Sequence, residues 1–416
     1  MKRFMLVLGL TAAVALLAVI PGALGRTQAT PGVTSTNIKI GTTLPLSGVA
    51  AIYSRIGVGM RAWFSYVNAR KSSVDHKRGV YGRQITLNIY DDGYQEANTV
   101  QQTRRAVEQD GVFAMLGGLG TENQLAVRDY LNQKKVPQLY VSTGLAGFAD
   151  LKNYPWTIGW QPDYAQEGIL LGKYVKANIP NAKIGVLFQN DDYGKQELEG
   201  FQNVVGKNAI VASRGYPRGG GSAAVTPLIP QLKASGADTL FIIATPQESY
   251  TSLAVAYKIG WKPNKIVNSV GATDTFMAVA KQIAGSPDAV EGVVTAQYLK
   301  DPVNPKYAND PQIKLYEKVM DKYAPSFPNP RDDGLFIYGM AKADTFVQAL
   351  YRAGKNPTRQ SLMNAVSHLT IKKDGWLIPG AKLITTPKSA FPLRYQTLSR
   401  YTNGHFTEFG NLVRTR

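Results

Sequence analysis

The stretch Val112-Phe-Ala-Met-Leu-Gly-Gly-Leu-Gly-Thr121 decides the fold class of this chain of 416 residues. Its first five residues, Val112 to Leu116, are all apolar, which is typical of a strand buried on both faces of a parallel sheet. A glycine-rich turn follows, and Thr121 begins a helix that we predict to run to about Gln133. A buried strand that passes through a short turn into a helix is the repeating unit of an α/β fold.

The same unit recurs on both sides of this stretch. Before it, alternating apolar residues predict strands near 38–42 and 85–89, and helical spacing predicts helices near 56–67 and 96–109. A strand at 138–141 completes one α/β lobe by about residue 155. The second series has predicted strands at 184–188, 210–213, 240–243 and 266–268, and predicted helices at 194–205, 225–235, 249–259 and 274–283. The later elements are a strand at 293–296, helices at 311–323 and 332–353, and short strands with turns from Gly375 onward.

Two lobes of this kind predict a cleft between parallel sheets that helices cover on both faces. In such sheets ligands bind beyond the carboxyl ends of the strands. We therefore expect a binding site in the loops that follow the strands. These loops are residues 44–53, 117–121, 142–146, 189–194, 244–248 and 269–274.

Composition excludes several classes of chemistry. The chain has no cysteine and three histidines, so a disulfide framework, a thiolate nucleophile and a cysteine-bound metal are ruled out. The formal net charge is +18, but lysines and arginines are spread along the chain in groups no longer than pairs such as Lys134-Lys135. This distribution favours a solvated basic surface over a nucleic-acid binding stripe. We predict no cofactor, no metal and no nucleic-acid partner.

The N-terminus has the build of a secretory signal peptide. Lys2 and Arg3 precede an apolar run from Phe4 to Ile20, and small residues end the run. We expect residues 1–25 to be removed by cleavage after Gly25, with cleavage after Ala29 or retention as a membrane anchor as alternatives. Residues 26–36 are a polar connector. The protein is expected to be exported to the periplasm or cell envelope, without a cysteine-linked lipid.

Small polar and aromatic residues supply the candidate ligand contacts, and each also has a purely structural interpretation. Thr121 to Gln124 match a T-x-x-Q capping box, where free amides attract an anionic group such as a carboxylate. Hydroxyls and bare backbone in the other loops suit a small polar ligand, although ordinary turns use the same residues. The candidates are Ser47, Gly48, Tyr53, Gly120, Thr121, Ser142, Thr143, Gly144, Tyr193, Thr245 and Gln247.

Enzyme signatures are missing from the sequence. It has no G-x-S-x-G elbow, no phosphate loop of the form G-x-x-x-x-G-K-[ST] and no complete G-x-G-x-x-G at a strand-to-helix turn. The pairs Asp91-Asp92 and Asp191-Asp192 are typical of solvated turns and helix caps rather than acid–base catalysis. We predict that the protein is not an enzyme.

Four segments together resemble a known family. They are IKIGTTLPLSG (Ile38 to Gly48), YDDGYQEANTVQQTRRAVEQDGVFAMLGGLGT (Tyr90 to Thr121), VPQLYVSTG (Val136 to Gly144) and DDYG (Asp191 to Gly194). In order and spacing they resemble the substrate-binding proteins of branched-chain amino-acid-type ABC importers, the leucine/isoleucine/valine-binding proteins. The resemblance spans roughly residues 36–410.

The resemblance implies a type I periplasmic-binding fold, in which two doubly wound α/β lobes are joined by three crossovers around an interlobe cleft. It places the crossovers near residues 156–161, 286–292 and 370–376. The first lobe would hold residues 36–158 and 290–372. The second lobe would hold residues 159–289 and 373–416.

The resemblance also implies roles for several residues. Thr121 and the loop from Ser142 to Ala146 would hold an amino-acid carboxylate, while Tyr53 and Tyr193 would enclose the side chain. Ala146 stands where amino-acid binders have a second hydroxyl, and Thr245 stands where they have an aromatic ring. Residues 268–272 lack the expected acidic partner for an ammonium group, although Asp274 is close.

A buried ammonium group without a carboxylate or an aromatic face is strongly disfavoured. We therefore expect a small carboxylate or amide ligand, aromatic acids included, rather than a standard branched-chain amino acid. The implied function is a monomeric ligand trap that delivers its cargo to the membrane subunits of an ABC permease. A ligand-sensing module on the same fold and an exported hydrolase are the alternatives.

Overall fold

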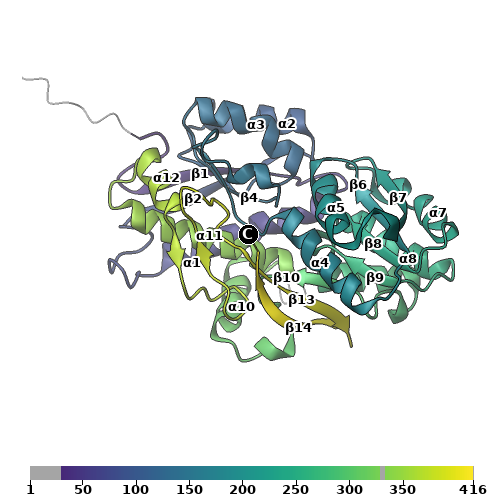
Figure 1. Ribbon diagram of the computed structural model, residues 1–416. Coiled ribbons are helices and arrows are strands. Elements are labelled where there is room, and N and C mark those ends of the chain that lie inside the picture. Colours follow the sequence, from purple (N-terminus) through teal and green to yellow (C-terminus); the bar gives the residue numbers. More distant parts are fainter. Residues whose placement is uncertain (1–29, 328–332, 416) are drawn as a thin grey trace, which may run out of the picture.

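The structure is a computed structural model that describes residues 30–327 and 333–415. The predicted signal peptide at residues 1–25 lies outside the described residues, and so do residues 26–29 of the predicted connector. The chain forms two α/β lobes that lie side by side, each built on its own sheet (Figure 1). The predicted α/β class with two lobes is confirmed.

The first lobe contains a five-stranded sheet in the order β2-β1-β3-β4-β5, and the pairs in it are parallel. Exposed and buried side chains alternate along the first half of β2, as expected for an edge strand with one face in solvent. Its strands are β1 (Asn37–Leu44), β2 (Gln84–Asp91), β3 (Met115–Leu116), β4 (Gln138–Val141) and β5 (Thr157–Gly159). Its helices are α1 (Ser54–Ala69), α2 (Glu96–Arg104), α3 (Thr121–Gln133), α10 (Pro311–Tyr323), α11 (Gly334–Ala353) and α12 (Arg359–Ser367).

The second lobe contains a seven-stranded sheet in the order β14-β13-β10-β9-β8-β6-β7. All five residues of its interior strand β8 are buried, and an antiparallel hairpin, β13 and β14, extends one edge. The strands are β6 (Ile184–Gln189), β7 (Ile210–Tyr216), β8 (Thr239–Ile243), β9 (Asn264–Val267), β10 (Val294–Gln297), β13 (Tyr395–Thr402) and β14 (His405–Arg414). The helices are α4 (Tyr164–Asn178), α5 (Asp192–Val205), α6 (Gly221–Val225), α7 (Leu228–Ala234), α8 (Pro246–Lys258) and α9 (Asp274–Ala284).

Short elements complete the described chain. A two-stranded antiparallel sheet pairs β11 (Thr370–Ile371) with β12 (Leu383–Ile384). One π-helical turn, η2 (Arg105–Gln109), continues α2. The 3₁₀ turns are η1 (Ala51–Tyr53), η3 (Ala146–Ala149), η4 (Lys207–Ala209), η5 (Ser269–Gly271), η6 (Pro287–Ala289) and η7 (Pro305–Tyr307).

Three chain segments join the lobes, and hydrogen bonds tie them to one another. The Lys300 amide donates to the Trp376 carbonyl at 2.9 Å, and the Leu393 amide donates to the Trp160 carbonyl at 3.3 Å. Trp160 and Trp376 are among the largest fully buried side chains, so the core is continuous through this region. The hinge is therefore a packed bundle of three segments.

The passages between lobes differ from those that the resemblance implied. β10 pairs with β9 and β13 in the second sheet, although residues 290–372 were assigned to the first lobe. Trp376 packs edge-on against Trp63 of α1, with ring centroids 5.2 Å apart, so residues just after 372 still contact the first lobe. The second passage thus follows Gln297, and the third ends near Arg394, where β13 begins at Tyr395. The pairing of β10 and of β13 in the second sheet places the end of the second passage and the end of the third.

Glycines bring two helix pairs into unusually close contact, one pair in each lobe. A Cβ added at Gly59 of α1 would lie 2.1 Å from the Phe336 carbonyl oxygen, and one at Gly339 of α11 would lie 2.1 Å from the Ile56 carbonyl oxygen. In the second lobe a Cβ at Gly168 of α4 would lie 2.2 Å from the Glu197 carbonyl oxygen, and one at Gly200 of α5 would lie 2.1 Å from that of Ala165. Only glycine permits such backbone approach. The first turns of these four helices all border the space between the lobes.

Candidate functional site

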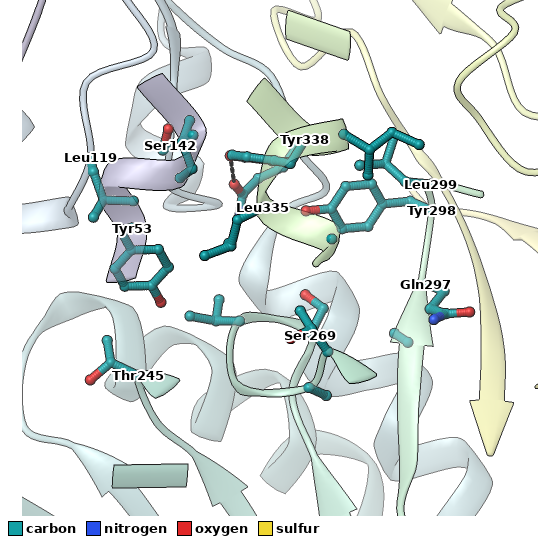
Figure 2. Close-up of a pocket in the computed structure, with 18 of the residues that line it drawn as sticks. Tyr53, Leu119, Ser142, Thr245, Ser269, Gln297, Tyr298, Leu299, Leu335 and Tyr338 are labelled. Atoms are coloured by element: carbon teal, nitrogen blue, oxygen red, sulfur yellow. Dashed lines mark hydrogen bonds between the residues drawn. The ribbon is translucent and has the colours of Figure 1, made fainter. Parts of the chain in front are cut away.

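A cavity of ≈ 140 Å³ lies between the lobes, and residues of both lobes and of the crossing segments line it. Tyr53, Leu119 and Ser142 lie on one side of it, and Thr245 and Ser269 lie opposite (Figure 2). Tyr298 and Leu299, from the second crossing segment, close a third side. A cavity open on part of its surface therefore lies where the sequence predicts an interlobe site.

The N-terminus of α3 forms one polar wall of the cavity. Gly120 precedes the helix with φ of +96°, a conformation that suits glycine, and no side chain of the described residues caps the first turn. The predicted capping box is wrong, because Thr121 is the first helical residue and the Gln124 side chain donates to Thr43 Oγ1 at 3.1 Å. Thr121 Oγ1 lies 2.6 Å from Thr143 Oγ1 instead. Uncapped first-turn amides and the helix dipole favour an anionic ligand group here.

A buried amine lies directly behind this wall. Ser142 Oγ donates to the Gly117 carbonyl at 2.7 Å and accepts a hydrogen bond from Lys342 Nζ of α11. Lys342 has no exposed surface, and its Nζ lies 4.0 Å from the centre of the Tyr338 ring. Burial holds the pKa of the Lys342 amine well below its ordinary value. Tyr338 lines the cavity and its hydroxyl donates to Gln161 Oε1.

Four tyrosines form an aromatic wall. Tyr53 and Tyr94 come from the first lobe, and Tyr164 and Tyr193 come from the first turns of α4 and α5. The rings of Tyr164 and Tyr193 have centroids 4.7 Å apart, a consequence of the close α4–α5 contact. Burial raises the pKa of all four phenols, so they remain neutral and offer apolar faces with hydroxyl tips.

The second lobe presents polar groups that are already engaged. Thr245 Oγ1 donates to Glu248 Oε2 at 2.6 Å. The Ser269 amide and hydroxyl donate to the two oxygens of Glu167 at 2.6 and 2.8 Å. A carboxylate thus lies behind residues 268–272, supplied by α4, which the sequence analysis did not predict. Burial raises the pKa of Glu167, while the donors from Ser269 and Gln396 lower it.

An acidic pair lies at the hinge end of the cavity. Asp274 begins α9 and its Oδ1 accepts the Phe406 amide at 3.1 Å. Asp301, on the second crossing segment, is hydrogen-bonded to Asp274, and burial raises the pKa of Asp301. Neighbouring Lys300 is paired with Asp310 at 2.6 Å. The hydrogen bond with Asp274 lowers the pKa of Asp301, but burial is the larger cause.

Contacts across the mouth hold the lobes together over the cavity. Arg218, in the glycine-rich loop after β7, reaches the first lobe and donates to the Tyr94 carbonyl at 2.7 Å and to Asn123 Oδ1 at 2.6 Å. Its guanidinium also pairs with Glu96 and lies 5.0 Å from the centre of the Tyr94 ring. A second contact between the lobes joins α5 to α3, where the Asp192 amide donates to Glu122 Oε1 at 3.0 Å. The structure is therefore a closed form.

The structure gathers seven of the predicted site residues around the cavity and leaves the others outside its lining. The seven are Tyr53, Gly120, Thr121, Ser142, Tyr193, Thr245 and Asp274. Thr143 supports Thr121 from behind, and the Ala146 amide donates across the mouth to Gln196 Oε1 at 2.9 Å. The Gly144 carbonyl accepts the Tyr164 amide at 2.9 Å, and Gln247 donates to Ser222. Ser47 and Gly48 are exposed beside the mouth.

Most of the residues that line the cavity are not among the predicted site residues. Tyr94 follows Asp91-Asp92-Gly93 at the end of a predicted strand, so the strand-end rule could have found it. Gln161 and Tyr164 lie where the first crossing enters α4. Leu335, Ile337 and Tyr338 belong to the first turns of α11, where local sequence gives no sign of a cavity.

Residues 30–327 and 333–415 hold no cluster of three or more histidine, cysteine, aspartate or glutamate side chains placed to bind a metal ion. In the same residues no helix is both long enough and apolar enough to cross a membrane.

Known proteins share this architecture and sequence. The family model described as "Periplasmic binding protein" matches residues 37–392. The Leu/Ile/Val-binding protein homolog 7 of Brucella abortus (strain 2308) is 24% identical over 334 residues, which are 78% of this chain and 79% of that protein.

Solved structures agree on the fold. A branched-chain amino-acid ABC transporter protein from Thermus thermophilus with bound valine has a TM-score of 0.80 at 17% identity, covering 92% of this chain and 98% of that one. A solute-binding protein of an ABC transporter from Rhodopseudomonas palustris BisB5, in complex with 3,4-dihydroxybenzoic acid, has a TM-score of 0.72 at 18% identity, with the same coverages. The chain belongs to the periplasmic binding protein family.

Proposed function

We propose that this protein captures a small carboxylate or amide ligand outside the cytoplasm by closing its lobes, and delivers it chemically unaltered to an ABC importer. The observation that carries the proposal is an interlobe cavity with one uncapped helix N-terminus at Thr121 and neutral aromatic walls. These are the features of a site that binds an anionic or amide group at one end and an apolar body at the other.

The polar groups of the cavity favour a carboxylate or amide ligand that lacks the ammonium group of an α-amino acid. The acceptors of the second lobe are engaged, since Glu167 accepts from Ser269 and Asp274 accepts from Phe406. A ligand ammonium group would have to displace one of these bonds, which is costly in a buried site. Ring faces from Tyr53, Tyr164 and Tyr193 suit a planar aromatic body.

Titration calorimetry tests the ligand class. We expect benzoate, benzamide or 3,4-dihydroxybenzoate to bind more tightly than leucine or valine, with the released compound unchanged on chromatography. Thr121→Val removes the hydroxyl beside the α3 amides and should weaken binding about tenfold. Gln133→Ala, at the exposed far end of the same helix, is the matched control and should bind as wild type. Micromolar or tighter leucine binding would contradict the proposed ligand class.

Export, the free monomeric state and the permease partner are parts of the same proposal. We propose cleavage of residues 1–25 and release into the periplasm or cell envelope, in keeping with the family's extracytoplasmic role. N-terminal sequencing of the exported form and its sedimentation behaviour test these points. A mature protein that still begins at Met1 would contradict cleavage.

A further inference from the structure

Lys342 is an ionisable residue that lies in the interior of α11 with no exposed surface. Its only hydrogen-bond acceptor among the described residues is Ser142 Oγ. No described carboxylate lies within ion-pair distance of Nζ. A buried ammonium ion without a counter-ion is strongly disfavoured, so in the ligand-free protein the amine is neutral.

The position of this amine links it to the cavity. Ser142 and Tyr338, which both contact Nζ, line the cavity themselves. Nζ therefore lies one side chain behind the wall that also carries Thr121 and the uncapped amides of α3. An anion bound against that wall is the one negative charge that this part of the structure can bring close to Lys342.

We propose that Lys342 supplies the counter-charge for the ligand's carboxylate, and that capture of each carboxylate places one proton on the Lys342 amine. The step is R–COO⁻ + Lys342–NH₂ + H⁺ → R–COO⁻···⁺H₃N–Lys342, in which no covalent bond between ligand and protein forms. The inference rests on the proposed function, because it requires an anionic ligand. The inference adds two points to the proposed function: Lys342 selects ligands that carry a negative charge, and one proton is taken up when such a ligand binds.

Among the groups around Lys342, the Lys342 amine is the one that can accept a proton when a carboxylate binds. On its own helix the nearest titratable group is the Tyr338 phenol, and Tyr164 and Tyr298 line other sides of the same cavity. Burial raises the pKa of these phenols, so they stay protonated with or without ligand. Ser142 from the end of β4 and Trp160 from the first crossing are not titratable. The acidic pair Asp274 and Asp301 is a second proton reservoir at the hinge end, which the variants below separate from Lys342.

Calorimetry in two buffers of different ionisation enthalpy, phosphate and Tris, counts the protons taken up at pH 7. The probes are the matched pair benzoate and benzamide, which differ in charge but share a ring, together with 3,4-dihydroxybenzoate and leucine. We expect uptake of close to one proton with a carboxylate and none with benzamide. Lys342→Met keeps the chain length in an apolar setting and should abolish the uptake. It should weaken carboxylate binding about tenfold or more and leave benzamide within about twofold.

A ligand-free measurement makes the test independent of probe choice. In ¹³C-lysine spectra, the signal that Lys342→Met removes should titrate far below the range of the other lysines. Lys342→Gln provides a second variant if the Met variant folds poorly, and Lys173→Met, on the exposed face of α4, is the control that should change nothing.

The outcomes separate this inference from the proposed function. Carboxylate binding without proton uptake, equal carboxylate affinity in Lys342→Met, or a Lys342 signal that titrates with the surface lysines would overturn the role of Lys342 and leave the ligand trap intact. Tight binding of benzamide alone would overturn the counter-charge role in the same way. Failure of every carboxylate and amide probe to bind would contradict both.

Discussion

Asp374 makes the stability of this protein depend on pH. Burial, together with the charge of nearby Asp344, raises the pKa of Asp374 to about 7. In the unfolded chain the same carboxyl group has an ordinary pKa, so between about pH 4 and pH 7 the folded state binds the extra proton. The stabilisation is fully present below pH 4 and is lost as pH rises through 7.

Asp374 therefore lowers the free energy of unfolding at pH 8 relative to pH 5, whereas the buried Lys342 amine acts in the opposite sense. Asp374→Asn should remove the Asp374 contribution to the pH dependence and raise the free energy of unfolding at pH 8 by about 1–3 kcal/mol, because it removes a buried charge. Urea titrations at the two pH values measure both effects. Asp129→Asn, on the exposed side of α3, should leave the slope as it is. An unchanged slope in Asp374→Asn would show that other groups cause it.

At the residue scale, the sequence predicts those site residues that sit at strand ends. Thr121 and Ser142 follow strands directly, and Tyr53 and Tyr193 also matched the family resemblance. Lys342 and Tyr338 could not be predicted, because they lie within a long apolar helix where spacing indicates only core packing. Their role depends on α11 lying against the end of β4, a contact between residues 200 positions apart.

At the scale of elements, the glycine-mediated contact of α1 with α11 sets how closely Tyr53 and Tyr338 can face the ligand. Gly339→Ala would place a Cβ 2.1 Å from the Ile56 carbonyl oxygen, so the helices must separate. We expect a loss of about 1–3 kcal/mol in the free energy of unfolding and weaker ligand binding. Denaturant unfolding and calorimetry check the two effects.

Gly147→Ala is the matched control for this experiment. A Cβ there meets its nearest atom at 3.5 Å, an ordinary contact, and φ is not positive. It should be close to neutral. If Gly339→Ala were equally neutral, the close approach of α1 and α11 would not be required for folding.

Most elements could be predicted from periodicity, and the exceptions have physical reasons. The predicted helix at 225–235 begins later, as α7, because Pro227 lacks the amide that would continue the preceding short helix α6. Of the predicted strand at 112–116, only Met115–Leu116 has regular strand structure, although Phe113 and Ala114 still exchange backbone hydrogen bonds with β1. Helices α4 and α12 were not predicted. The apolar positions of α4 include glycines that pack against α5, which hides the usual helical signal.

At the scale of the whole molecule, Arg218 joins the lobes in the closed form. It bonds to Tyr94 and Asn123 of the opposite lobe, and Tyr94 also lines the cavity. Closure therefore fixes a cavity wall as well as the mouth. The partner carboxylate Glu96 is half exposed, so the ion pair itself adds only a modest amount of free energy.

Arg218→Ala should shift the ligand-free protein toward an open form and weaken binding about three- to tenfold, because less of the protein is ready to close. Small-angle X-ray scattering should show a larger radius of gyration without ligand and a value near wild type at saturating ligand. Arg214→Ala is the control, since Arg214 bonds to Gln231 and Ser213 within its own lobe. An Arg218→Ala protein with wild-type scattering and affinity would assign closure to other contacts.

The lobe arrangement itself was predictable only in part. Alternating strands and helices indicate two α/β lobes, but the assignment of β10 to the second sheet depends on long-range pairing with β9 and β13. The third passage near Arg394 also depends on packing of Trp376 against Trp63. Neither contact leaves a local pattern in the sequence.

The contact between Glu122 of α3 and Asp192 of α5 at the closed mouth has a practical consequence. Because the chain lacks cysteine, thiols introduced at two exposed positions beside these residues would be the protein's sole labelling points. A donor and an acceptor dye attached there would move apart whenever the mouth opens. The change in energy transfer between the two dyes would therefore report opening and closing of the lobes directly, and any compound that favours the closed form would change the signal.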